Sequence, residues 1–327
     1  MLNTLTSAPR VWIEQNGPLV GVIGIEYSFV LPSYSEEPLY GIGKSERSEH
    51  TEVMKILTKI TLKKGDKYVS IDTSVYNNVK NHRMRVAFPT SVKTDVAAAS
   101  GHFTVDERTI IPTKDSSGAY WKEMQTQPMQ HFVDLSNEVR GLALLSNSIT
   151  EYEAVDDGKN TLYLTLFRSM GNMIVTGWEC VNRFPHQEGS QLQRRMDFSY
   201  AVYPHKGNWS QACVYAQAER FISEPYIYQT IGNHKGKLPY SGCFMEITDD
   251  NLVLSAFKKA DDGNGYILRI FNPCHKEIKA EVIFSTDIVC ANYSSMVEGI
   301  REKAEFLNNR LRVFIAPNKI ISYRLVF

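Results

Sequence analysis

The sequence lacks the motifs by which most enzymes are recognised. Its eight histidines form no H-x-D, H-x-H or H-E-x-x-H pair, and it has no G-x-S-x-G elbow, Walker loop or dinucleotide glycine fingerprint. The nearest histidine–carboxylate spacing joins His131 and Asp134, which stand three apart on an expected strand and should point to opposite faces. The spacing therefore predicts no metal site and no catalytic residue in this chain.

An excess of one charge and long hydrophobic runs are also absent. Thirty-six basic residues balance thirty-six acidic ones, so no net field attracts nucleic acid or an anionic membrane. No apolar stretch approaches the length of a membrane span, and the first residues do not resemble a secretory signal. We expect neither a nucleic acid nor a membrane as partner; neutral sugars and protein surfaces suit this balance better.

Cysteine is scarce, and its spacing suggests no pairing. The five cysteines are an odd number, none forms a C-x-x-C pair, and a chain of 327 residues can bury a core without disulfides. Hydrophobic residues make up 43% and charged residues 22%, which is typical of globular proteins. We predict reduced thiols and a cytoplasmic location.

Helical periodicity is nearly missing as well. Short segments rich in Val, Ile, Thr and aromatic residues alternate with polar positions and follow one another closely, which predicts antiparallel strands. Between two of them, Asp157-Gly158 predicts a tight type I′ hairpin turn. Residues 209–223 alone have apolar positions at helical spacing, and we predict one helix there.

The order of these segments predicts two domains. Residues 224–242 carry two prolines and several glycines, which is typical of a connector. Six further short strand-like segments follow, at the spacing of a small sandwich. We predict an all-β chain, with a large antiparallel β-sandwich over residues 1–235 and a small C-terminal β-sandwich over residues 236–327.

Polar and aromatic side chains give weaker indications. Strand alternation would place Asn81, Arg83 and Arg85 on one face, which could meet solvent, another domain or a sugar. The aromatic residues could stack on sugar rings or fill the sandwich cores. Neither pattern decides between these alternatives.

Several sequence blocks stand in a recognisable order. Residues 77–90, NNVKNHRMRVAFPT, are similar to N-x-x-x-D-H-R-L-R-V-x-F-P-T, and residues 130–147, QHFVDLSNEVRGLALLSN, to W-V-D-L-S-x-x-x-x-G-L-A-V-L-N-x. LTLFRSMG at 164–171 is similar to L-T-L-L-R-S-V-G. These blocks resemble the C-terminal β region of glycoside hydrolase family 38, the α-mannosidases, and in particular its bacterial mannosylglycerate-hydrolase-like branch. Asn81 departs from the usual Asp, and Ser190 from the Ala of a G-A-Q block.

The resemblance implies both a fold and a function. The large sandwich would be a galactose-mutarotase-like super-sandwich, and the chain would be the accessory part of a retaining α-mannosidase that acts on α-mannosides. Retention needs two closely spaced carboxyl groups, and the resemblance assigns these, together with zinc, to an N-terminal catalytic barrel that has no counterpart in this chain. We therefore expect no cofactor here and no mannosidase activity from this chain alone. The barrel itself would be its partner.

Arg168 and Gln191 are the candidate substrate-binding residues. Arg168 ends a strand shortly before Gly171, and its guanidinium could bind sugar hydroxyls or a glycerate carboxylate; a structural ion pair is the alternative. The amide of Gln191 can both donate and accept a hydrogen bond. We expect both side chains on the sandwich rim that faces the barrel, where they would help to shape its substrate pocket.

Two other functions remain open for the whole chain. A stand-alone carbohydrate-binding module would need an exposed aromatic platform. An oligomerisation module would need an exposed, self-complementary apolar patch with a two-fold contact. A homo-oligomer is therefore possible under either reading.

Overall fold

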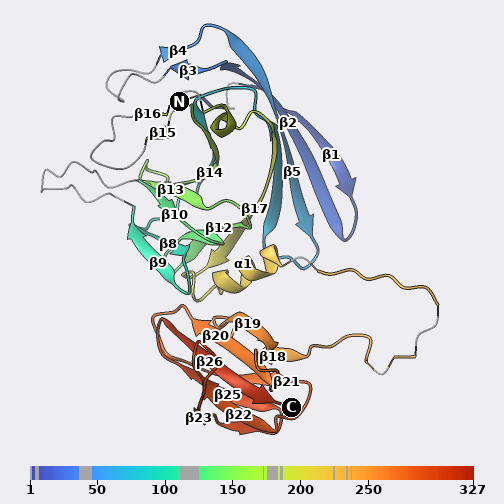
Figure 1. Ribbon diagram of the computed structural model, residues 1–327. Helices are drawn as coiled ribbons and strands as arrows, with labels where there is room; N and C mark the ends of the chain where they lie inside the picture. Colours follow the sequence, from blue (N-terminus) through green and yellow to red (C-terminus); the bar gives the residue numbers. More distant parts are fainter. Residues whose placement is uncertain are drawn as a thin grey trace, which may run out of the picture. The chain divides into compact units, whose positions relative to one another are not determined.

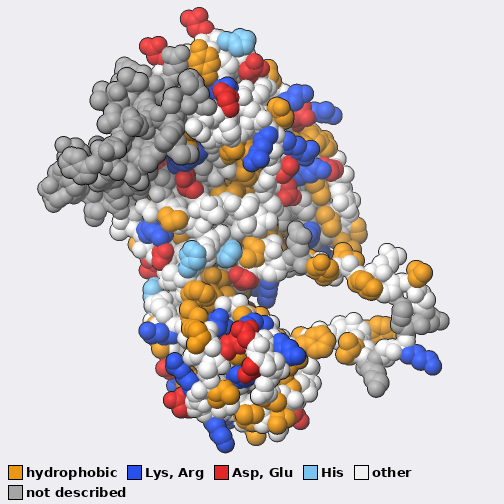
Figure 2. All heavy atoms as spheres, in the orientation of Figure 1, with side chains coloured by type: hydrophobic (Ala, Val, Ile, Leu, Met, Phe, Trp, Pro, Cys, Tyr) orange, Lys and Arg blue, Asp and Glu red, His pale blue; other side chains and the backbone are white. Residues whose placement is uncertain are grey.

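A computed structural model describes residues 2–3, 7–36, 46–110, 125–171, 173–174, 183–184, 187–223, 225–232, 235–236 and 238–327 (Figure 1). Within these ranges the chain is built from antiparallel sheets with one α-helix, which confirms the predicted all-β fold. None of the described helices is long and apolar enough to span a membrane. Basic and acidic side chains are interspersed over the face drawn in Figure 2, in keeping with the balanced composition.

The largest sheet has nine strands in the order β1-β2-β5-β6-β17-β12-β11-β8-β9. Their bounds, in that order, are Arg10–Asn16, Val20–Pro32, Thr51–Lys63, Val69–Tyr76, Arg195–Lys206, Arg140–Ser146, Phe132–Ser136, Val96–Ser100 and Val105–Thr109. Side chains alternate between the two faces, and in β6 the buried residues lie on one of them; in β12 and β11 the opposite face is buried too, with Leu145 and Phe132. The first of these faces is buried over β6, β17, β12 and β11, where it forms one half of the core.

The other half of this core comes from a four-stranded sheet in the order β10-β13-β14-β7, with bounds Thr126–Pro128, Glu151–Val155, Thr161–Ser169 and His82–Pro89. Two ring contacts join the sheets: Phe88 meets Tyr200 edge-on at 6.1 Å, and Phe167 stacks on Phe198 at 6.2 Å. Smaller elements nearby are the strand pairs β3 and β4 (Ser35–Glu36, Glu46–Arg47) and β15 and β16 (Met173–Ile174, Arg183–Phe184), and the 3-10 helix η3 (Glu188–Gln191).

Strand β14 contains a β-bulge. Thr165 pairs with Arg85 and Phe167 with Met84, so Leu166 is an extra residue without a partner of its own. Beyond the bulge, Arg168 pairs with Arg83, and both point away from the core. The bulge therefore sets the face on which the arginine lies.

The hairpin predicted around Asp157 is present, but its turn is not of type I′. Strands β13 and β14 pair up to Val155 opposite Thr161, which leaves a five-residue loop, residues 156–160. Gly158 has a positive φ of 80°, but Asp157 does not; its carboxylate instead accepts hydrogen bonds from the Lys159 N–H (3.0 Å) and the Thr161 hydroxyl (2.6 Å). These side-chain bonds stabilise a wider turn than the sequence suggested.

Contacts divide the chain into two compact units, residues 1–97 with 108–208, and residues 98–107 with 209–327. In the second unit one sheet has the order β18-β21-β25-β24, with bounds Met245–Ile247, Ile278–Phe284, Arg310–Ile315 and Phe306–Leu307. The other has the order β19-β20-β26-β22-β23, with bounds Val253–Lys259, Tyr266–Asn272, Lys319–Val326, Cys290–Ser294 and Ile300–Lys303. The domain boundary at 235/236 stays a prediction.

Helix α1, Val214–Ile222, is shorter than the predicted 209–223. Residues 209–213 form turns, because Cys213 adopts a left-handed conformation with φ of 50° and interrupts the helical backbone. Trp209 is buried all the same, and its indole N–H donates to Glu107 Oε1 at 3.1 Å.

Four of the five cysteines lie in the described residues, and all four are free thiols.

Candidate functional site

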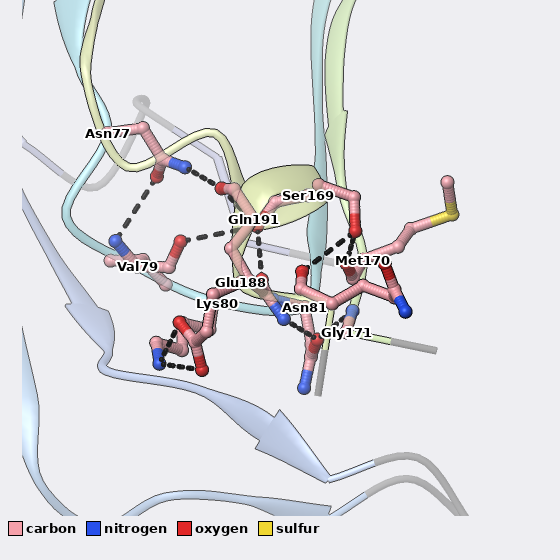
Figure 3. A network of polar contacts seen from close by, with 11 residues as sticks. Asn77, Val79, Lys80, Asn81, Ser169, Met170, Gly171, Glu188 and Gln191 are labelled. Atoms are coloured by element: carbon pink, nitrogen blue, oxygen red, sulfur yellow. Dashed lines mark hydrogen bonds and ion pairs between the residues drawn. The ribbon is translucent and has the colours of Figure 1, made fainter. Parts of the chain in front are cut away.

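A network of polar side chains joins the ends of four elements in the first unit (Figure 3). Its members are Asn77, which follows β6, Asn81, which precedes β7, Ser169 at the end of β14, and Gln191 at the end of η3. Asn77, Ser169 and Gln191 are buried. Because buried polar groups must be hydrogen-bonded, this network fixes how the four elements meet.

Gln191 stands at the centre of the network. Its Oε1 accepts hydrogen bonds from the Asn81 backbone N–H at 3.0 Å and the Ser169 hydroxyl at 2.7 Å, and its Nε2 donates to Asn81 Oδ1 at 2.7 Å. Asn77 Nδ2 donates to the Gln191 carbonyl at 2.9 Å. The amide that the sequence suggested for a sugar is thus engaged within the protein, and its role in substrate binding stays a prediction.

The backbone at Asn81 departs from strand geometry just before β7, and its side chain joins the network from there. Its φ is 55°, so it lies outside β7 and does not share a face with Arg83 and Arg85; that expectation was wrong. Its Oδ1 accepts the Gly171 N–H at 2.9 Å, and its Nδ2 donates to the Ser35 carbonyl at 2.8 Å. An aspartate could accept the first bond but could not make the second.

Gly171 is required by the same packing. A Cβ on this residue would lie 2.6 Å from Gln191 Nε2, closer than real side chains approach. The Gly171 carbonyl also accepts the Gln187 N–H at 3.0 Å. The glycine of LFRSMG is therefore a consequence of close backbone approach to the amide network.

Arg168 lies on the outer face of the four-stranded sheet, where it is paired with Glu151. Its Nε donates to Glu151 Oε2 at 3.1 Å, and its second terminal nitrogen donates to Oε1 at 2.8 Å. Both side chains are half-buried. The guanidinium is therefore held in a defined orientation, and its substrate contact stays a prediction.

Arg168 belongs to a charged cluster, which we define as Arg83, Arg85, Glu151, Glu153 and Arg168. Arg83 and Arg85 share one strand face as predicted, and both pair with Glu153. The guanidinium of Arg85 also lies over the Tyr163 ring at 4.3 Å. The printed ion pairs hold the three guanidinium groups in defined positions on the outer face of the sheet.

Burial and neighbouring charges shift the pKa values of two members of the charged cluster. Burial alone would raise the pKa of Glu151, but the hydrogen bonds and charge of Arg168, together with the charge of Arg83, hold it below its ordinary value. Burial and the like charge of Arg85 lower the pKa of Arg83. Glu151 therefore stays ionised, while Arg83 and Arg85 repel one another.

A buried histidine–carboxylate pair was missed in the sequence. His205 Nε2 lies 2.8 Å from Asp134 Oδ1, both side chains are buried, and the Ser136 hydroxyl donates to Asp134 Oδ2. They lie on β17 and β11, with β12 between them, where a Cβ on Gly141 would stand 2.3 Å from the His205 ring. The serine bonds the carboxylate and not the imidazole, so no nucleophile is activated.

Burial gives another histidine a pH-dependent role. His82 packs edge-on against Phe167 at 5.3 Å, and burial lowers its pKa to about 4 from 6.5, although the Lys80 carbonyl partly opposes this. The unfolded chain then binds more protons than the folded one between pH 6.5 and 4. We expect acidification through this window to lower the unfolding free energy by about 2 kcal/mol, after allowing for solvent at the ring.

The measurement is chemical denaturation at a series of pH values, on the natural protein and on His82→Met. The variant should lose the part of the pH dependence that lies between pH 6.5 and 4, whereas His50→Met, at an exposed histidine, should keep it. Equal slopes for all three proteins would show that His82 does not contribute.

In the described ranges no group of three or more His, Cys, Asp or Glu side chains could hold a metal ion. In the second unit, Phe257 and Tyr266 stack at 5.7 Å with an interplanar angle of 18°, and both rings are partly exposed. This pair has the aromatic character of a sugar platform.

The comparisons with known proteins agree with one another. The family model described as "Glycosyl hydrolases family 38 C-terminal domain" matches residues 3–172, and "Glycosyl hydrolases family 38 C-terminal beta sandwich domain" matches residues 251–323. A "Putative mannosylglycerate hydrolase" of Halalkalibacterium halodurans is 28% identical over 95% of this chain, which covers 34% of that protein. An "Alpha-mannosidase" of Saccharomyces cerevisiae is 23% identical over 79% of the chain, which covers 24% of it.

A solved structure shows the same fold. An alpha-mannosidase from Enterococcus faecalis V583 superposes with a TM-score of 0.83 at 23% identity, over 99% of this chain and 36% of that one. The chain thus spans about a third of the length of its bacterial relatives.

Proposed function

The chain belongs to glycosyl hydrolase family 38 as its C-terminal region, and from this we propose that it is the accessory β part of a retaining α-mannosidase. The observation that carries the proposal is the match to both C-terminal family models by a chain that covers 34% of its bacterial relative. In this proposal an N-terminal catalytic barrel supplies the two carboxyl groups and the zinc. The present chain supports that barrel and helps to shape its substrate pocket.

The test is a chimera. The Halalkalibacterium halodurans relative is produced whole, without its C-terminal third, and with that third replaced by this chain. With an aryl α-mannoside as substrate, we expect little turnover from the shortened protein and from this chain alone, and restored turnover from the chimera. A chimera no more active than the shortened protein would contradict the proposal, as would turnover or about one bound zinc in the isolated chain.

Arg168 is the proposed contact to substrate in this arrangement. Its guanidinium is partly exposed and is held in one orientation by two hydrogen bonds to Glu151. Such a fork suits sugar hydroxyls or a glycerate carboxylate. Gln191 is proposed as its companion at the rim, through the network that fixes the end of β14.

Arg168→Ala tests this contact in the active chimera. We expect turnover to fall about tenfold or more, while the unfolding free energy changes by less than about 1 kcal/mol, because Glu151 keeps Arg83 as a neighbour. The control is Arg195→Ala, which removes an exposed arginine paired with Asp197. If Arg168→Ala loses stability and its folded fraction has normal kinetics, Arg168 is structural.

The second candidate function is a carbohydrate-binding module, favoured by the stacked Phe257 and Tyr266. Isothermal titration of the isolated chain with mannose oligosaccharides distinguishes the two. Binding that is lost in Tyr266→Ala would support the module.

A further inference from the structure

Strand β1 is the outer strand of the nine-stranded sheet and pairs with β2 on one side only. Six of its seven residues are exposed, and the seventh, Trp12, is half-buried. Natural edge strands are commonly protected by charged side chains, proline or bulges, and in β1 these stand only at the ends of the central Val11-Trp12-Ile13 segment, as Arg10, Glu14 and a bulge after Ile13. Its outer backbone N–H and C=O groups are therefore available to another strand.

The face of the sheet next to this edge is apolar. The register places Val11 and Ile13 of β1 on the same face as Ile23 of β2 and Leu62 of β5. These side chains are 59%, 69%, 44% and 54% exposed, and the same face continues into the buried core at β6. We call these four residues the edge patch. An exposed apolar patch beside an edge strand is typical of an interface.

The sequence of β1 is complementary to itself. Arg10-Val11-Trp12-Ile13-Glu14 reads basic, apolar, aromatic, apolar, acidic, so its two halves about Trp12 match in hydrophobicity and oppose in charge. An antiparallel pair of such strands, centred on the tryptophans, sets each Arg10 opposite a Glu14 and each Val11 opposite an Ile13. Both kinds of pair stabilise antiparallel sheets.

The local contacts fit this arrangement on both faces. On the outer face Trp12 lies over Gly24, whose missing side chain makes room for the ring, and Arg10 lies 5.4 Å from the ring centroid. On the inner face the edge patch would join its counterpart. The register shifts between Ile13 and Gln15, so regular pairing ends at Ile13, and the bulged Glu14 also pairs with Lys59 of β5 at 2.5 Å.

We propose that two copies of the chain pair antiparallel through β1 about a two-fold axis at Trp12, which joins their two nine-stranded sheets and edge patches. The occupant of this edge is therefore a second copy of the chain. A two-fold strand pair uses both edges, so assembly stops at the dimer. This inference concerns assembly and does not depend on the proposed catalytic role.

The test exploits the opposed charges. In a dimer of Arg10→Glu chains each introduced carboxylate faces the natural Glu14 of the other copy, and in a dimer of Glu14→Arg chains each introduced guanidinium faces the natural Arg10. In a mixture of the two variants, every pair across the axis is again opposite in charge. Sedimentation velocity should show a dimer for the natural chain at micromolar concentration, roughly tenfold weaker association for each variant alone, and recovery on mixing.

A second pair of variants separates the patch from general surface effects. Ile13→Lys should abolish the dimer, whereas Val30→Lys, at a comparably exposed valine on the opposite face of β2, should leave it intact. Circular dichroism confirms that each variant is folded. A natural chain that remains monomeric at about 100 µM would overturn the proposal. So would variants that fail to recover on mixing.

Discussion

Asp134→Ala should lower the unfolding free energy by about 3–5 kcal/mol. The carboxylate is fully buried and is bonded by His205 and by the Ser136 hydroxyl, so its removal leaves two buried polar groups without an acceptor and opens a small cavity. Urea denaturation followed by circular dichroism measures the change.

The chain offers a matched control in Asp197, which accepts from the Ser74 hydroxyl and pairs with Arg195 but is largely exposed. Asp197→Ala should cost less than about 1 kcal/mol, because water replaces the lost partner. Similar losses for both variants would mean that burial does not strengthen the Asp134 interactions.

Gln191→Ala should lower the unfolding free energy by about 4 kcal/mol, since three hydrogen bonds of a buried amide disappear at once. The Asn81 backbone N–H would lose its acceptor, whereas the Ser169 hydroxyl would still donate to the backbone carbonyl of residue 191 and Asn81 Oδ1 would keep the Gly171 N–H. We expect the loss to be visible in thermal unfolding of the isolated chain, which needs no substrate.

Glu188→Ala is the control, because Glu188 lies on the same short helix but bonds only the exposed Lys80. It should change stability by less than about 1 kcal/mol. If Gln191→Ala is equally mild, and instead weakens turnover in the chimera, the amide serves the substrate and not the fold.

The alternation of apolar and polar residues was enough to predict most of the strands, because side chains alternate between the two faces of a strand whichever strands it pairs with. The hairpin of β13 and β14 was also predicted, but its turn was not, because the bonds from Lys159 and Thr161 to the Asp157 carboxylate outweigh the local preference for type I′. The helix was predicted too long because a left-handed Cys213 leaves no trace in the apolar period.

The candidate site was harder to predict. Asp134 and His205 are 71 residues apart and meet only because β12 separates their strands and carries a glycine between them. The sequence singled out Gln191, but its three partners lie on segments whose approach no local pattern encodes. Long-range strand order therefore determines this site.

The bulge at Leu166 makes residue parity an unreliable guide in β14. Leu162 and Arg168 are separated by an even number of positions, which in a regular strand would send the guanidinium into the core beside Phe167. One extra leucine reverses that parity, so the apolar run before the arginine ends with its charge outside. Deleting Leu166 would restore a regular strand and leave every pairing on either side in place, so this position can lose a residue without turning the arginine inward.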